Sequence, residues 1–234
     1  MNLAHNENEV TRLSNDVFTM DKILLGDVFI RGGSSSGTHV LEEGRPIGQF
    51  YGLVCNGIDE NGRYILVDKD GDGEISDPAD YDYIGSAQPK LTYGITNSFR
   101  YKNFDLSFFL RGTIGNDILN ATRMAYAQSG FLPGTNALDD PLTYTLSETP
   151  RFSNYYLEKG SFMRLDNLTL GYKIKALNGI RVYFTAQNLF VITKYKGLDP
   201  EVPMDSGDGL TPGVEPREFY PKARTFSVGL NLNF

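Results

Sequence analysis

Cysteine, histidine and tryptophan are nearly absent from this sequence. Its 234 residues include one cysteine, two histidines and no tryptophan. A single cysteine excludes an internal disulfide framework and a thiolate zinc site of the usual four-ligand kind. Cys55 is therefore interpreted as a small, half-buried side chain in a strand. His5 and His39 are isolated in the sequence, and two scattered histidines form neither a catalytic triad nor a metal cluster.

The sequence also lacks long apolar runs and an excess of basic residues. No stretch approaches the roughly 18 consecutive apolar residues of a membrane-spanning helix, although a β-barrel crosses a membrane with short alternating segments instead. The formal net charge is −7. Because phosphate binding needs clustered Lys and Arg, this charge disfavours a nucleic-acid partner.

Residues 1–10, MNLAHNENEV, lack the parts of a secretory signal. They contain no basic region, no apolar core and no small-residue cleavage site. If the protein works outside the inner membrane, the chain is therefore expected to be either the tail of a longer precursor or the product of an open reading frame that lost its beginning.

Aromatic residues and glycine are plentiful. The sequence contains 14 Tyr, 15 Phe and 25 Gly, a balance that favours strands and turns over helices and predicts an all-β fold. The clearest strand is the last one, residues 222–234, where apolar and polar side chains alternate with a period of two. Its length of roughly ten residues suits a tilted strand that crosses a bilayer. The apolar side consists of Phe226, Val228, Leu230, Leu232 and Phe234.

A hairpin is predicted upstream, with strands at 91–101 and 104–111 joined by a tight connection. Asp105 and Arg111 fall on the less apolar side of the second strand. Burial of these charges in a dry core would be costly, whereas a water-filled interior removes the difficulty. Further strands are predicted at 162–173, where Arg164 and Asp166 mark a polar end or a bulge, and at 181–192.

Short turns and long loops are distributed unevenly along the chain. Residues 59–90, 112–161 and 194–221 read as long loops, while the turns between the other strands are short. This asymmetry is typical of outer-membrane barrels. Within the second loop, residues 116–130 predict a short helix with Asn116 as N-cap and Gly130 at its end. Residues 1–43 form a polar region of uncertain register, and residues 44–58 predict one strand.

The loop 59–90 carries the acidic run DKDGDGEISD. Alternate carboxylates followed by Gly73 match the first half of a calcium-binding loop, but Ala79 stands where an EF-hand has its bidentate Glu. The run therefore predicts either a structural Ca²⁺ site or a solvated acidic turn. The candidate calcium ligands are Asp68, Asp70, Asp72, Glu74, Asp77 and Asp80.

Three segments near the end of the chain have the sequences SFMRLDNLTLGY, VYFTAQNLFVITKYKGLDPEV and FYPKARTFSVGLNLNF, at 161–172, 182–202 and 219–234. They resemble the C-terminal blocks of the SusC/RagA family of TonB-linked outer-membrane proteins. The resemblance extends upstream to GRPIGQFYGLVCNGI, the acidic run, IGSAQPKLTYG and YKNFDLSFFLRGTIGND, in the family's order. A terminal strand that ends on Phe also resembles the assembly signal of outer-membrane barrels.

The resemblance implies an outer-membrane barrel of about 22 strands with a plugged lumen. About seven strands would lie in this chain, with residues 44–234 as the C-terminal segment of the barrel. The plug, the N-terminal domain and the segment bound by TonB would lie elsewhere. A SusD-like surface lipoprotein would be the partner, and a glycan or a peptide the substrate. The expected lumen-lining residues are Arg100, Asp105, Arg111, Tyr183 and Gln187.

Two other classes of protein are weighed against this importer. A secreted, calcium-dependent, carbohydrate-binding β-sandwich would be soluble, with its apolar strand faces packed beneath a second sheet. A glycan-degrading enzyme is disfavoured, because nothing fixes the geometry of the carboxylates at Asp139, Asp140 and Glu148.

Overall fold

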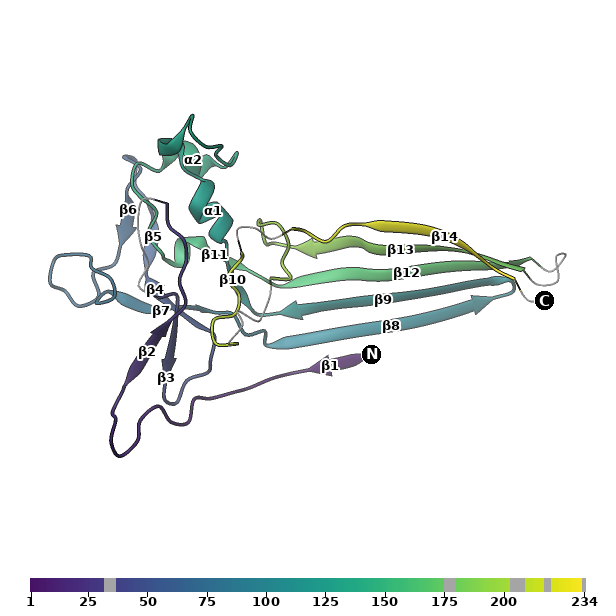
Figure 1. Ribbon diagram of the computed structural model, residues 1–234, viewed down its shortest axis with the longest axis horizontal. Helices are drawn as coiled ribbons and strands as arrows, with labels where there is room; N and C mark the ends of the chain where they lie inside the picture. The colour runs from purple at the N-terminus through teal and green to yellow at the C-terminus, as the bar shows by residue number, and fades with distance from the viewer. Residues whose placement is uncertain (32–36, 175–179, 203–208, 217–219, 233–234) are drawn as a thin grey trace.

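The computed structural model describes residues 1–31, 37–174, 180–202, 209–216 and 220–232. It consists of one long antiparallel sheet and a compact head at one end of that sheet (Figure 1). The long sheet has the order β1-β8-β9-β12-β13-β14. Its strands are β1 (Asn2–Ala4), β8 (Leu91–Tyr101), β9 (Phe104–Ile114), β12 (Phe162–Ile174), β13 (Ile180–Thr193) and β14 (Thr225–Asn231).

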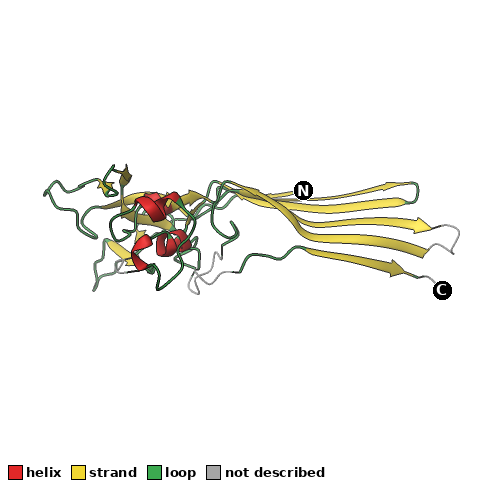
Figure 2. Cartoon of the chain, turned by 90° about the horizontal axis from the view of Figure 1, so that it is seen from above, coloured by secondary structure: helices red, strands yellow, loops and turns green. Residues whose placement is uncertain are grey.

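The head contains the short elements. Seen from above, they gather at one end while the long strands extend away from them (Figure 2). A four-stranded sheet contains β2 (Lys22–Leu25), β3 (His39–Glu42), β4 (Gln49–Leu53) and β7 (Tyr81–Ser86). Two further pairs are β5 (Cys55–Ile58) with β6 (Tyr64–Leu66) and β10 (Asp117–Leu119) with β11 (Leu157–Lys159). The helices are α1 (Ala121–Tyr126), α2 (Pro141–Thr145) and the 3₁₀ turns η1 (Ser129–Phe131) and η2 (Asn154–Tyr156).

The connections of the long sheet confirm the predicted asymmetry. At the end far from the head, β8 and β9 are joined by Lys102 and Asn103 alone, with Lys102 at a φ of 53°. The connection between β12 and β13 at that end, 175–179, lies outside the described residues. All three long connections, 5–90, 115–161 and 194–224, leave the sheet at the head end (Figure 1).

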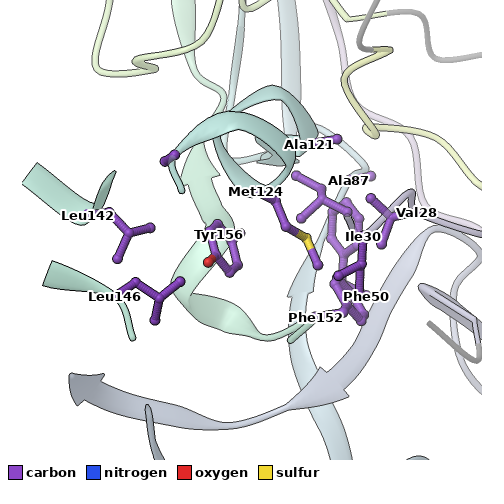
Figure 3. Packing of buried hydrophobic residues seen from close by; sticks show 12 residues of the cluster. Val28, Ile30, Phe50, Ala87, Ala121, Met124, Leu142, Leu146, Phe152 and Tyr156 are labelled. Atoms are coloured by element: carbon purple, nitrogen blue, oxygen red, sulfur yellow. The ribbon is translucent and has the colours of Figure 1, made fainter. Parts of the chain in front are cut away.

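The head is held together by a buried apolar core. Phe50 of β4, Met124 of α1 and Phe152 pack in one cluster, together with the ring of Tyr156 (Figure 3). Full burial of each large apolar side chain stabilises a fold by about 1.5–3 kcal/mol. The core also includes Val28, Ile30, Ala87, Leu119, Ala121, Ala127, Leu142 and Leu146. Residues far apart in sequence thus pack into one core within the head.

Several predictions about the loops are wrong in detail. The segment 44–58 forms two strands, β4 and β5, instead of one. The segment 112–161 is much more regular than expected, because it contains β10, β11 and both helices. Helix α1 starts after Asn120, not after Asn116, and it ends at Tyr126, before Gly130. The reason is that Asn116 directly precedes β10, which pairs with β11 and cannot begin a helix.

Two other predictions concern β12 and the domain boundary. The predicted irregularity at Asp166 is confirmed, since the register of β12 shifts between Leu165 and Asn167 against both neighbouring strands. β3, which precedes the expected boundary at residue 43, pairs with β4 beyond it. The boundary itself stays a prediction.

Candidate functional site

The long sheet has one apolar face, and its strand register keeps that face continuous. Phe104 is paired with Tyr172 of β12, and Phe184 of β13 is paired with Val228 of β14. These side chains are exposed, Phe104 by 51% and Val228 by 75%. A soluble monomer rarely exposes so large a contiguous apolar surface. Across the described residues no second sheet covers this face, which counts against the β-sandwich alternative.

The residues of the expected assembly signal follow this pattern. Phe226, Val228 and Leu230 lie on the exposed apolar face of β14, and Leu232 follows just beyond the strand with half of its surface exposed. Phe234 lies outside the described residues. A role in assembly stays a prediction.

The five predicted lumen-lining residues lie on the opposite, polar face. Arg100 of β8 is paired with Asp105 of β9. Tyr183 of β13 lies level with Asp105, on the other side of Gly171 of β12. Gln187 is paired with Asn167 at the middle of the sheet. Arg111 is six residues from Asp105 along β9, about 20 Å at the rise of a strand. The five residues are therefore spread along the polar face of the long sheet, which we call the wall, and do not form a single compact site.

An ion pair crosses a whole strand on this polar face. Arg181 of β13 donates two hydrogen bonds to Asp105 of β9, at 2.9 Å from Nε and 2.5 Å from Nη2. The pair passes over Gly171 of β12, where an added Cβ would lie only 2.4–2.5 Å from its atoms. Glycine at this position therefore leaves the space that the ion pair needs. The sequence gave no sign that Arg181 and Asp105 are partners.

A second charged cluster lies at the head end of the polar face. Arg111 of β9 donates to both carboxylate oxygens of Glu201, at 2.7 and 2.9 Å, and to Asp166 at 3.1 Å. Arg164 of β12 donates to Asp199 at 2.5 Å. Asp199 and Glu201 belong to the connection between β13 and β14, which therefore lies against the polar face of the sheet.

The electrostatics of this cluster favour the charged forms. Arg164 and Asp199 are only 3% and 5% exposed, so each is the main counter-charge of the other. Burial raises the pKa of Glu201, but hydrogen bonds from Arg111 and Lys222 outweigh this effect and hold the pKa below its usual value. The sequence predicts a long loop at 194–221 and gives no sign that Asp199 and Glu201 contact the polar face of the sheet.

The acidic loop brings three of its six candidate ligands together. Carboxylate oxygens of Asp68, Asp70 and Asp80 lie within 4.8 Å of one another. Asp80 is 1% exposed, and backbone N–H groups of Ser76 and Lys69 bind its carboxylate and lower its pKa. Oxygen ligands at this spacing fit a hard cation such as Ca²⁺.

The other three candidate ligands lie outside this group. Asp72 accepts a hydrogen bond from the backbone N–H of Glu74 at 2.8 Å. Asp77 forms an ion pair with Arg151 at 2.7 Å.

The carboxylates weighed as catalytic groups have structural contacts. Asp140 accepts from the N–H of Leu142 at the start of α2 and from Arg123 Nε at 2.9 Å. Glu148 accepts from the N–H of Tyr64 at 3.1 Å. These contacts explain both side chains without a catalytic role.

None of the helices among the described residues has the length and hydropathy that a membrane-spanning helix requires.

Known proteins resemble this chain in sequence. No family model matches it. The TonB-dependent receptor SusC of Bacteroides thetaiotaomicron is 35% identical over 252 aligned positions, which cover 100% of this chain and 24% of that protein. The TonB-dependent receptor P3 of Formosa agariphila is 34% identical over 237 positions, 84% of this chain and 23% of the relative. The chain thus spans about a quarter of the length of these curated relatives.

The fold resembles a solved importer. The RagAB peptide importer in its closed-closed state superposes with a TM-score of 0.72 and 25% sequence identity, over 97% of this chain and 26% of that one. These named relatives are receptors and importers. The two-faced sheet, the asymmetric connections and the similar proteins agree: the chain is a segment of an all-β, transmembrane-barrel fold and belongs to the SusC/RagA family of TonB-dependent receptors of the bacterial outer membrane.

Proposed function

We propose that this chain forms part of the wall and mouth of an importer that carries oligomeric nutrients, glycans or peptides, across the outer membrane without chemical change. The observation that carries the proposal is the separation of the two faces. Strand register aligns apolar side chains on one side, which would contact lipid. Arg100, Asp105, Arg111, Tyr183 and Gln187 lie on the other side, which would face water.

The direction of the wall follows from its connections. Outer-membrane barrels have short turns at the periplasmic side and long loops at the outer side. The head would therefore stand outside the cell, where it could contact a SusD-like surface lipoprotein. Energy from TonB would act through parts of the receptor other than this chain. Co-purification of the lipoprotein with the intact receptor tests the partner.

The transport function is tested in a strain that lacks its own receptor gene and expresses the full-length receptor carrying this segment. We expect growth on a restricted set of oligosaccharides or peptides supplied as the sole nutrient. Tyr183→Ala and Gln187→Leu, on the polar face, should change the uptake rate while the receptor's abundance in the outer membrane stays normal. Phe184→Leu, on the lipid-facing side, is the matched control and should leave uptake unchanged. Wild-type uptake by both polar-face variants would contradict the proposal.

We further propose that the acidic loop binds Ca²⁺ as a structural ion through Asp68, Asp70 and Asp80. Calorimetry on the intact receptor separates this from a solvated turn. Asp70→Asn should weaken calcium binding strongly, because Asp70 lies within the group of three carboxylates. Asp72→Asn is the matched control, since Asp72 lies outside it, and should weaken binding less. Equal heats for both variants and for the wild type would end the proposal.

A further inference from the structure

Two described parts of the connection between β13 and β14, residues 194–202 and 209–216, lie on the polar side of the long sheet. We call these two parts the strap. Asp199 and Glu201 of the strap bind Arg111 and Arg164, whose side chains lie on the polar face. A loop that extended freely above the rim of a barrel would not reach side chains on that face. The strap therefore occupies part of the space in front of the polar wall.

The contact with the wall joins both ends of the connection. Glu201 accepts hydrogen bonds from both terminal nitrogens of Arg111, and Arg164 Nε lies 3.5 Å from the same carboxylate. Lys222, three residues before the start of β14, forms a short ion pair with it as well. Charge-assisted and bidentate hydrogen bonds of this kind are stronger than neutral ones.

A second contact fixes the other part of the strap to the head. Gly213 accepts a hydrogen bond from the N–H of Leu119 at 2.9 Å, and Glu215 N–H donates to the carbonyl of Leu119 at 3.0 Å. His39 Nε2 donates to the Pro212 carbonyl at 2.9 Å. Gly213 has a φ of 77°, and a Cβ there would lie 2.6 Å from the Ala87 side chain. The strap is thus held at the wall and at the head.

A cavity separates the strap from the wall. Its volume is about 290 Å³, and its lining includes Thr92 and Thr113 of the wall and Val202 of the strap. Val202 is buried, 5% exposed. Beside the ion pairs that join the strap to the sheet, this cavity leaves space between the two, so the strap takes up cross-section at the mouth.

We propose that the strap is a fixed constriction at the mouth of the lumen, and that it limits the size of the solutes that enter on this side. The inference rests on the proposed function in one respect, the assignment of the polar face to the lumen. Arg111 and Arg164 act as positioning residues: Arg111 donates to Glu201, and Arg164 donates to Asp199. The strap is then a determinant of substrate size.

The first test measures whether the strap is fixed. The full-length receptor, in a cysteine-free form that includes Cys55→Ala, carries Val202→Cys and is treated on intact cells with a small maleimide. We expect labelling at least tenfold slower than for Tyr220→Cys, whose side chain is 84% exposed. Adding Arg164→Gln should raise the V202C rate to nearly that reference. The matched control is Lys159→Gln, which removes an exposed ion pair with Asp117 in the head and should change nothing.

The second test measures the constriction. Thr113→Cys lies at the cavity, and maleimides on polyethylene glycol chains of increasing length report how large a molecule reaches it. In the otherwise unchanged receptor only short reagents should react, and with Arg164→Gln longer reagents should react too. The charge-swapped pair Arg164→Asp with Asp199→Arg should restore the original limit. A heat-modifiable gel shift confirms that each variant is a folded barrel.

Two results would overturn the inference. One is a maleimide labelling rate of V202C as high as that of Y220C in the receptor that keeps Arg164 and Asp199. The other is an unchanged reagent limit at T113C when Arg164→Gln is present in a folded barrel. Both measurements report the strap whether or not the receptor imports a nutrient. A protected strap in a receptor that supports no uptake would therefore refute the proposed function alone.

Discussion

A charged side chain placed on the apolar face of β14 tests the whole assignment of faces. Val228 lies at the middle of β14, is 75% exposed and is paired with Phe184. If this face contacts lipid, Val228→Arg places a charge near the middle of the bilayer, at a cost of about 2–4 kcal/mol. Since each 1.4 kcal/mol is a factor of ten, the ratio of folded to unfolded receptor should fall by roughly 30-fold to several hundred-fold.

Two neighbouring positions supply the controls. Ser227→Arg places the same charge one residue away on the polar face, where water surrounds it, and should change stability little. Leu230 is paired with Val182, near the start of β13, so Leu230→Arg lies closer to the interface. The destabilisation by Leu230→Arg should therefore fall towards about 0–1 kcal/mol, the range typical of interfacial positions.

The assay is urea-dependent folding of the full-length receptor into lipid vesicles, followed by the gel shift between folded and unfolded barrel. The expected order of destabilisation is Val228→Arg first, then Leu230→Arg, then Ser227→Arg. Equal stability of Val228→Arg and Ser227→Arg would refute the reasoning, because two faces in the same solvent respond alike.

Three further predictions concern the strap and the sheet. Arg164→Met should destabilise the receptor by about 3–5 kcal/mol because it leaves Asp199 buried without a counter-charge, and the double variant with Asp199→Asn should recover most of that loss in the same urea assay. The folded pKa of Glu201 is lowered, so its contribution to stability is present above the ordinary value of 4.5 and is lost as the pH falls through the lower folded pKa. In the urea assay repeated at decreasing pH, the stability difference between the wild type and Glu201→Gln should therefore disappear only in that acidic range. Gly112→Ala should destabilise the pairing of β9 with β12 by about 1–3 kcal/mol, because its Cβ would lie 2.0 Å from the backbone oxygen of Phe162 in β12. The control is Gly130→Ala, whose Cβ meets nothing within 4 Å and which should leave thermal unfolding unchanged.

The long strands could be predicted from the sequence because the signal for them is local. Alternation along 91–101, 104–111, 162–173 and 181–192 requires only neighbouring residues, and the strands appear at those places. The irregularity at Asp166 was visible for the same reason, as a break in the alternation. The same alternation identified which side chains lie on the apolar face of the long sheet and which lie on the polar face.

The head could not be predicted in this way. Its strands are three to six residues long, too short for a pattern to repeat. Its core joins Phe50, Met124 and Phe152, which no local period connects. The choice between Asn116 and Asn120 as helix cap depended on the pairing of β10 with β11, which is a property of the folded chain.

The ion-pair partners were beyond sequence reasoning for a related cause. Asp105 and Arg181 are 76 residues apart, and only the register of three strands brings them together. Arg164 and Asp199 meet because the strap folds inwards, which composition does not reveal. Sequence patterns therefore identified the surfaces, and the register determined the contacts on them.

The contact between Asp105 and Arg181 has a mechanical consequence. Asp105 is level with Gly171 and Tyr183, whereas Arg181 is level with Lys173, so the bond runs diagonally across three strands. A crosswise tie barely changes length when strands begin to slide, but a diagonal tie lengthens or shortens at once. Sliding of β13 past β9 must therefore break two charge-assisted hydrogen bonds at the outset. This stretch of wall is braced against shear by side chains as well as by its backbone.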